Sequence, residues 1–545
     1  MTAACAALAV ALTLIVPASA QSRYHLRGEE ALVRVYDYIL EARFDQVDAE
    51  LRRACGPAPV EACDVLAATS LWWRILLDPE SRRLDDEFSA AVERAIKAAE
   101  AWTERVPQDP EAWFYLGGAY AARVQWRVLR DQKLAAARDG KRIKEALEEA
   151  IALAPTLDDA YFGIGLYRYY AGVAPAAARF LRFLLLLPGG DRDEGLEQML
   201  RARERGRLFQ GEADYQLHLV YLWYEERPDR ALELLQGLQR QYPMNPLFLM
   251  RIAEIQDTYQ HDVTASLATW RTLHGMAREQ RVNAAALAEA RARLGIAQQL
   301  EVLQQTDRAI EHLQDLVAAK PTAPHGALAT GYLKLGEAFD RLGERVEAVA
   351  AYKHAASAAS ADEIDSIGEA AARHLRNAPD RRTTDAYRLS LEGWRKLEAN
   401  DLDGASDALE RSLKLQPRAP VTHYRYGRVL QARREDAGAL AEFERTIRDA
   451  RACPAPILGA AYLEAARLHE RAGHRERAIA EYRTAETLFG AAEETRTAAT
   501  RALARLQSRD RSDRPIHPIT RSLDRSIARS IVPRRSIRQI QCANF

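Results

Sequence analysis

Two stretches of this chain come close to metal-binding spacings but do not match them. His469 and His474 resemble a zinc-protease motif, yet they lie one residue too far apart to share one turn of a helix. The run 401–404 begins like a calcium loop, but no glutamate follows at the twelfth loop position. The chain also lacks a Gly-x-Ser-x-Gly elbow and a phosphate-binding glycine loop. We therefore predict no metal site, no cofactor and no enzymatic activity.

Two cysteines are spaced for a different kind of chemistry. Cys55 and Cys63 flank the stretch Gly56-Pro-Ala-Pro59, which we expect to be the turn between two helices. In an oxidising compartment, a disulfide here would stabilise the fold by ~2.5 kcal/mol. No further cysteine or histidine pair lies nearby at metal-ligand spacing, so a disulfide is favoured over a metal site.

The overall charge bounds the class of partner. The chain has 545 residues with 77 Lys+Arg and 77 Asp+Glu, so its formal net charge is zero. A dedicated nucleic-acid binder would normally carry a basic surplus. We therefore expect no nucleic-acid partner. The 48% hydrophobic content also excludes a wholly disordered chain.

The first twenty residues contain no charged side chain. Their apolar run, Ala6 to Val16, is too short to span a bilayer and precedes the cleavage-type stretch Pro17-Ala-Ser-Ala20. We predict a signal peptide over residues 1–20, and therefore an exported, periplasmic protein. A helical N-terminal arm is the alternative. No later segment is long and apolar enough to span a membrane.

The rest of the chain repeats. Amphipathic helical periods recur, whereas strand signals are almost absent. One stretch carries all the landmarks of a tetratricopeptide repeat: Tyr332, Leu335, Gly336, Phe339, Gly343, Ala348, Tyr352 and Ala355. Gly393 and Gly427 are 34 residues apart, as are Ala405 and Ala439. The chain therefore resembles the tetratricopeptide repeat (TPR) family.

This resemblance implies the fold class. One repeat unit cannot bury its own apolar face, so the units must stack. We expect an all-α, TPR-like right-handed superhelical solenoid of about eleven antiparallel helix pairs. An N-terminal array with long helices would cover residues 21–283, and a more regular array would cover 284–506. Residues 507–545 form a basic low-complexity tail, which we expect to be disordered; weak membrane contact is its alternative role.

The segment 158–256 carries a second resemblance. Its Gly163-Ile-Gly165 helix, a following apolar stretch, and the Gly190-Asp-Arg-x-x-Gly-Leu196 turn are similar to the inclusion-body clearance (outer-membrane-protein-like) branch of TPR proteins. That branch brings no catalytic activity to carry over. The Gly-Gly-Asp-Arg turn also has a purely structural interpretation, in which Asp191 caps the following helix.

The TPR resemblance also implies a binding surface. In TPR arrays, positions 2, 5, 9, 12 and 13 of each first helix line the concave groove. That register selects Asp159, Phe162, Leu166, Tyr169, Tyr170, Gln216, Val220, Trp223 and Tyr224. Aromatic side chains in a groove could receive a peptide segment. The alternative is that these aromatics pack against one another in the core.

We therefore expect a non-catalytic scaffold or adaptor that binds an unidentified protein in this groove. A different class of function also fits the sequence. The aromatic and leucine-rich segment from Phe162 to Leu187 could carry a small hydrophobic ligand or a lipid acyl chain. Bound lipid in the purified protein would favour the carrier, whereas a peptide-binding groove would favour the adaptor.

Overall fold

The computed structural model describes residues 23–173 and 189–512, and every regular element in these ranges is helical. The predicted signal peptide and almost all of the basic tail lie outside the described residues. Within them, no helix is long and apolar enough to cross a membrane.

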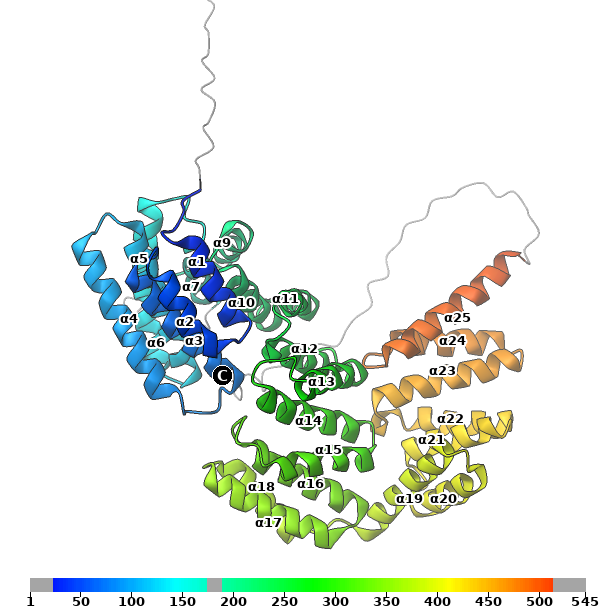
Figure 1. The fold of residues 1–545 in the computed structure, drawn as a ribbon. Helices are drawn as coiled ribbons and strands as arrows, with labels where there is room; N and C mark the ends of the chain where they lie inside the picture. The colour runs from blue at the N-terminus through cyan, green and yellow to red at the C-terminus, as the bar shows by residue number, and fades with distance from the viewer. Residues whose placement is uncertain (1–22, 174–188, 513–545) are drawn as a thin grey trace, which may run out of the picture.

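The helices pack as antiparallel pairs along the chain (Figure 1). The eleven pairs are α1 (Glu29–Leu40) with α2 (Phe44–Ala54), α3 (Val60–Leu77) with α4 (Asp85–Arg105), α5 (Pro110–Leu129) with α6 (Lys133–Leu153), α7 (Ala160–Val173) with α9 (Arg192–Arg205), α10 (Gln210–Trp223) with α11 (Pro228–Gln241), α12 (Pro246–Thr258) with α13 (Val263–Arg278), α14 (Ala285–Val302) with α15 (Thr306–Ala319), α16 (Ala327–Leu342) with α17 (Arg345–Ala361), α19 (Arg381–Glu398) with α20 (Leu402–Leu415), α21 (Pro420–Ala432) with α22 (Asp436–Arg448), and α23 (Ala455–Arg471) with α24 (Arg475–Thr487). Two further described helices, α18 (Asp365–Arg376) and α25 (Glu493–Ser512), lie outside these pairs; α18 packs on α17, and α25 packs on α24. The predicted all-α solenoid of about eleven pairs is confirmed.

The landmark glycines allow the two helices of a pair to approach closely. A Cβ atom on Gly336 would lie 2.5 Å from the ring of Tyr352, and one on Gly427 would lie 2.7 Å from the ring of Phe443. Any larger residue would therefore force the paired helices apart. The large aromatic residue on the second helix fills the space that the glycine leaves.

In the C-terminal half, the first helices of successive units also touch one another. Contacts run from α14 through α16, α19, α21 and α23 to α25. These six helices form an inner layer, and their partner helices lie outside it (Figure 1). The predicted boundary near residue 284 falls between α13 and α14 and remains a prediction.

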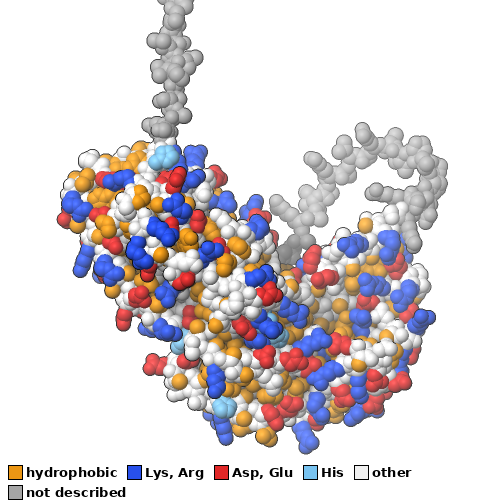
Figure 2. Space-filling view, viewed as in Figure 1, with side chains coloured by type: hydrophobic (Ala, Val, Ile, Leu, Met, Phe, Trp, Pro, Cys, Tyr) orange, Lys and Arg blue, Asp and Glu red, His pale blue; other side chains and the backbone are white. Residues whose placement is uncertain are grey.

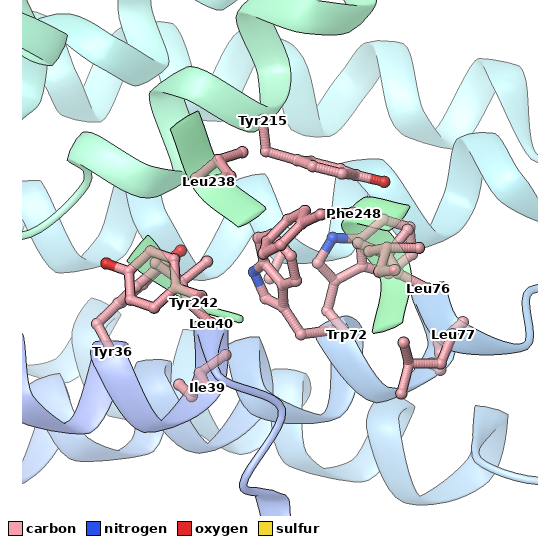
Figure 3. Packing of buried hydrophobic residues seen from close by; sticks show 14 of the residues in the cluster. Tyr36, Ile39, Leu40, Trp72, Leu76, Leu77, Tyr215, Leu238, Tyr242 and Phe248 are labelled. Carbon is pink, nitrogen blue, oxygen red and sulfur yellow. The ribbon is translucent and has the colours of Figure 1, made fainter. Parts of the chain in front are cut away.

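The N-terminal half closes on itself. Helices α1 and α3 pack against α10, α11 and α12, which lie far from them in the sequence (Figure 3). The ring of Trp73 lies 4.9 Å from that of Tyr215 and 6.3 Å from that of Phe248, centroid to centroid. Tyr36 contacts Phe209 edge to face at 5.5 Å. The concave side of these units is therefore filled by the chain's own first helices.

A buried carboxyl group lies within this filled interior. One oxygen of Glu212 accepts hydrogen bonds from the Tyr36 hydroxyl at 2.8 Å and from the Trp73 indole at 2.9 Å. The other oxygen accepts one from the Gln216 amide at 3.1 Å, which also donates to Gln125 at 2.6 Å. Burial raises the pKa of Glu212. Because buried polar groups need partners, this network fixes how α1 and α3 meet α10.

The α1–α2 turn is held by residues more than two hundred positions away. The Glu41 carboxylate accepts a hydrogen bond from the Met244 backbone N–H at 2.7 Å. The Asn283 side chain donates to the Glu41 carbonyl, and the Asn245 side chain donates to the Leu40 carbonyl, both at 2.8 Å. These contacts tie the start of the solenoid to α12 and to the α13–α14 turn.

The C-terminal half closes in a different way. Arg496, in the first turn of α25, lies 3.2 Å from the carboxylate of Asp262, which precedes α13. The ring of Phe489 packs edge to face on His261, and Gly490 approaches the His261 carbonyl so closely that a Cβ would lie 3.0 Å from it. Helices α13 to α25 thus form a nearly closed ring (Figure 1), which we call the C-terminal ring.

Cys55 and Cys63 meet at the α2–α3 turn. Their sulfur atoms lie 1.96 Å apart and their Cα atoms 6.1 Å apart, as in a disulfide bond. Cys453 is buried and free, and burial raises the pKa of its thiol to about 12. A buried thiol of this kind is inert rather than catalytic.

Removing the aromatic contacts of the N-terminal interior should destabilise the protein strongly. We expect Trp73→Ala to lower the free energy of unfolding by about 3–5 kcal/mol, because it leaves a cavity. Tyr36→Phe should cost about 1–3 kcal/mol, because it removes one donor from Glu212. Urea unfolding followed by circular dichroism measures both. Tyr38→Phe is the control, since its hydroxyl bonds to no other described residue. Equal effects of Tyr36→Phe and Tyr38→Phe would contradict the network.

Closure of the C-terminal ring should depend on one ion pair. Asp262→Asn keeps the helix cap on the Ala265 N–H but removes the charge that Arg496 meets. We expect faster hydrogen exchange in residues 259–266 and 488–496, and a larger maximum dimension by small-angle X-ray scattering. Glu493→Gln removes only the exposed partner of Arg496 and should change neither. Identical behaviour of the two variants would argue against this closure.

Candidate protein-binding surface

Most of the predicted groove residues lie in the core. Five are at most 7% exposed: Asp159, Phe162, Tyr169, Gln216 and Val220. They cannot offer a surface to a partner, and the reason is the shape of the N-terminal half. The register assumed an open superhelix. Instead, Phe162, Tyr169 and Val220 pack in one cluster with residues of α9 and α10, and the Gln216 side chain bonds to Gln125 of α5. These five residues lie in the core, as the alternative prediction expected.

Asp159 shows what such a position does instead. Its carboxylate accepts hydrogen bonds from the backbone N–H groups of Arg207, Leu208 and Phe209 at 2.9–3.0 Å. Burial raises the pKa of Asp159, while these bonds oppose the shift. The side chain therefore anchors the turn that leads into α10. Asp191 likewise caps α9 by accepting from the Glu194 N–H at 2.9 Å.

The other four predicted residues reach the surface. Leu166, Tyr170 and Trp223 are half-buried, and Tyr224 is 43% exposed. The rings of Tyr170 and Tyr224 meet edge to face at 5.4 Å, and each also contacts Tyr169 at 5.9 Å. A partner contact at these four residues remains a prediction. The candidate ligand-carrying segment, Phe162 to Leu187, lies partly outside the described residues.

A second surface was not predicted from the sequence. A groove of about 620 Å³ opens between α23 and α25, with α24 behind it. Eight residues line it: Arg467, Glu470, Arg471, Tyr482, Ala498, Arg501, Ala502 and Arg505. Four arginines and one glutamate give this lining a charge balance of +3.

The arginines of this groove occupy matching repeat positions. Arg467 and Arg501 are 34 residues apart, and so are Arg471 and Arg505. Each pair therefore stands at the same place on consecutive first helices, one unit apart along the inner layer. The register used to select residues 159–224 would have found this surface if it had been applied to α23 and α25.

Two of these arginines are held by acidic neighbours. Arg505 donates to both oxygens of Glu470, at 2.8 and 2.7 Å, and Tyr482 also donates to that carboxylate at 2.8 Å. Arg471 binds both oxygens of Asp436, at 3.1 and 2.9 Å. The Arg471–Asp436 pair is bidentate, through Nε and Nη2, whereas Arg505 uses Nη2 for both oxygens of Glu470. Arg471 and Arg505 therefore line the groove with carboxylate partners already in place.

The other two arginines keep donors available. Arg467 uses one nitrogen to contact Glu464 at 2.6 Å. Arg501 is exposed, and no ion pair or hydrogen bond joins its guanidinium to another residue in the described part of the chain. A guanidinium carries five N–H donors, so both side chains can still receive an oxygen ligand.

The near-miss metal motifs have structural roles. Asp401 caps α20 by accepting a hydrogen bond from the Gly404 N–H at 2.9 Å. His469 is buried within α23, and its Nδ1 lies 3.3 Å from that of His474. Across residues 23–173 and 189–512, no three acidic, histidine or cysteine side chains are grouped to hold a metal ion.

One half-buried acid lies close to this groove. Glu481, on α24, has one oxygen 3.6 Å from the Nε2 of His469. Burial, together with the nearby Glu444, raises the pKa of Glu481 to about 7. Burial lowers the pKa of His469. Both side chains are therefore biased toward their neutral forms. Neutral side chains cost less free energy than charged ones when they pack between helices.

No protein-family model and no curated protein matches the chain. Among solved structures, a tetratricopeptide repeat protein from Parabacteroides merdae ATCC 43184 is 15% identical, covers 55% of this chain and 98% of its own, and has a TM-score of 0.24. The TPR2AB domain of yeast Sti1, solved with pHSP90, is 15% identical over 55% of this chain and 97% of its own, with a TM-score of 0.21. A Rap protein complexed with competence and sporulation factor is 12% identical over 88% and 99%, with a TM-score of 0.32. At these identities and scores, the similarities carry no inference about partners.

Glu481 should make the C-terminal ring less stable at alkaline pH. A carboxyl group with a raised pKa in the folded state stabilises the fold below its unfolded pKa of about 4.5, and loses that contribution as pH rises through about 7. We expect Glu481→Gln to reduce the loss of stability between pH 5 and pH 8 by about 2–3 kcal/mol. Urea unfolding at both pH values measures it, with the exposed Glu476→Gln as control. The same pH dependence in both variants would contradict this assignment.

Proposed function

We propose that this protein is a non-catalytic scaffold or adaptor that binds a partner protein on the inner face of its C-terminal ring. One observation carries the proposal. The concave side of the N-terminal half is filled by α1 and α3, whereas the inner layer of the C-terminal ring offers an open, arginine-lined groove between α23 and α25.

The chemistry of the groove favours binding over catalysis. Its four arginines stay protonated at any physiological pH, so none of them can act as a base. Its glutamate already accepts hydrogen bonds from Arg505 and Tyr482. Rigid donors, small side chains and one engaged carboxylate make a recognition surface rather than an acid–base pair.

We also propose that the protein is exported. The predicted signal peptide supports export, and so does the pairing of Cys55 with Cys63, because such a bond persists in oxidising compartments. The alternative role as a hydrophobic carrier has less support. Phe162 and Tyr169, in the described part of that segment, are packed against Met199, Leu217 and other residues of α9 and α10.

Site-specific photo-crosslinking in envelope extracts tests the scaffold. A benzoylphenylalanine at Ala498 would line the groove, whereas one at Val346, which is 80% exposed on the outer helix α17, is the matched control. We expect a partner protein to be captured at least about tenfold more strongly from position 498, because only that position faces the inner layer. Equal capture from both positions, or capture from position 346 alone, would contradict binding on the inner face.

A further inference from the structure

We infer that the groove between α23 and α25 binds an acidic segment of a partner protein, whose carboxylates are received by Arg467 and Arg501. This inference rests on the proposed function and specifies its ligand chemistry. The proposed occupant is a peptide in an extended or a helical form. Two of its carboxylates are separated by about the distance between Arg467 and Arg501, which stand on consecutive first helices.

The choice of acceptor follows from the arginines. A guanidinium is planar and matches a carboxylate through two parallel N–H···O bonds. At this groove, Asp436 binds Arg471 in that manner through Nε and Nη2, and both oxygens of Glu470 accept from Nη2 of Arg505. Arg501 has no such partner among the described residues, and Arg467 has a single contact. Two of the four groove arginines are therefore paired with carboxylates of this chain. The other two, Arg467 and Arg501, can receive carboxylates of a partner.

The floor of the groove leaves space for a main chain. Ala498 and Ala502 present only methyl groups, and Tyr482 is buried with its hydroxyl directed to Glu470. Small side chains let a peptide backbone approach the helices closely. The volume of about 620 Å³ lies within the range of sites that hold a ligand of a few residues.

A nucleic acid fits the same groove less well. Proteins that bind single strands combine basic grooves with exposed aromatic rings on which bases stack. The only aromatic residue of this groove, Tyr482, is 1% exposed, and acidic Glu464, Glu470 and Asp436 are paired along the same row. On the visible face of the molecule, Figure 2 shows basic and acidic side chains interleaved, rather than a block of one sign.

The occupant is expected to come from another protein. Residues 511–545 of this chain hold eight arginines and two aspartates, a balance of +6. A segment with the same sign of charge as the groove would be repelled by it. An acidic partner is attracted instead, and its binding should weaken as salt increases.

Fluorescence anisotropy with the full chain and a fluorescein-labelled hexaglutamate peptide tests this inference. We expect Arg501→Gln and Arg467→Gln each to weaken the Kd about fivefold, and the double variant about twentyfold or more. Hexaglutamate should also bind more weakly at 200 mM than at 50 mM salt. The control is Arg411→Gln, which removes the same charge from an exposed arginine of the outer helix α20 and should leave the Kd unchanged.

Three results would overturn the inference. The first is hexaglutamate binding that the double variant leaves unchanged, because the peptide would then bind elsewhere. The second is a labelled hexathymidylate that binds as tightly as hexaglutamate and loses affinity in the same variants, which would indicate a nucleic-acid site. The third is partner capture at position 498 without measurable hexaglutamate binding. In that last case the scaffold would stand while the acidic ligand would not, so the two proposals fail separately.

Discussion

An antiparallel helix pair leaves one apolar face uncovered, and the whole structure depends on how each part of the chain covers that face. Successive units cover one another along the solenoid. In the N-terminal half, α1 and α3 fold back onto α10 and α12, so that Trp73 and Tyr36 meet at the buried carboxyl group of Glu212. In the C-terminal ring the units curve more openly, and part of the inner layer stays accessible.

This difference separates the roles of the two halves. In the N-terminal half the interior is filled, and hydrogen bonds tie the α1–α2 turn to Met244 and Asn245 at the start of α12. An open inner layer leaves the C-terminal ring with a surface of fixed shape, because each first helix contacts the next. Its arginines project from two such helices at equal repeat positions. The arginine-lined groove is thus a product of the repeat itself, at a place where the described inner layer stays accessible.

The local structure could be predicted because it depends on residues close in sequence. The spacing of Gly393 and Gly427 gave the helix pairs, and the position of Cys55 and Cys63 gave the turn that joins them. The path of the superhelix could not be predicted in this way. The path adds up small rotations between many successive units. Whether distant residues such as Asp262 and Arg496 meet depends on that total rotation. Tyr169 and Gln216 were therefore placed in a groove, although they lie in the core.

The central claim is that the first helices fill the N-terminal interior, and a cross-link tests it most directly. Cysteines at Glu41 and Met244, in a chain whose Cys5, Cys453 and Cys542 are replaced by serine, should be joined by a short bis-maleimide, because the Glu41 carboxylate binds the Met244 N–H. The same reagent should not join Glu41→Cys to Val346→Cys. Efficient cross-linking of the first pair alone would show that the α1–α2 turn docks on the start of α12. If the first pair is not joined, the N-terminal half is open and its groove is available to a partner.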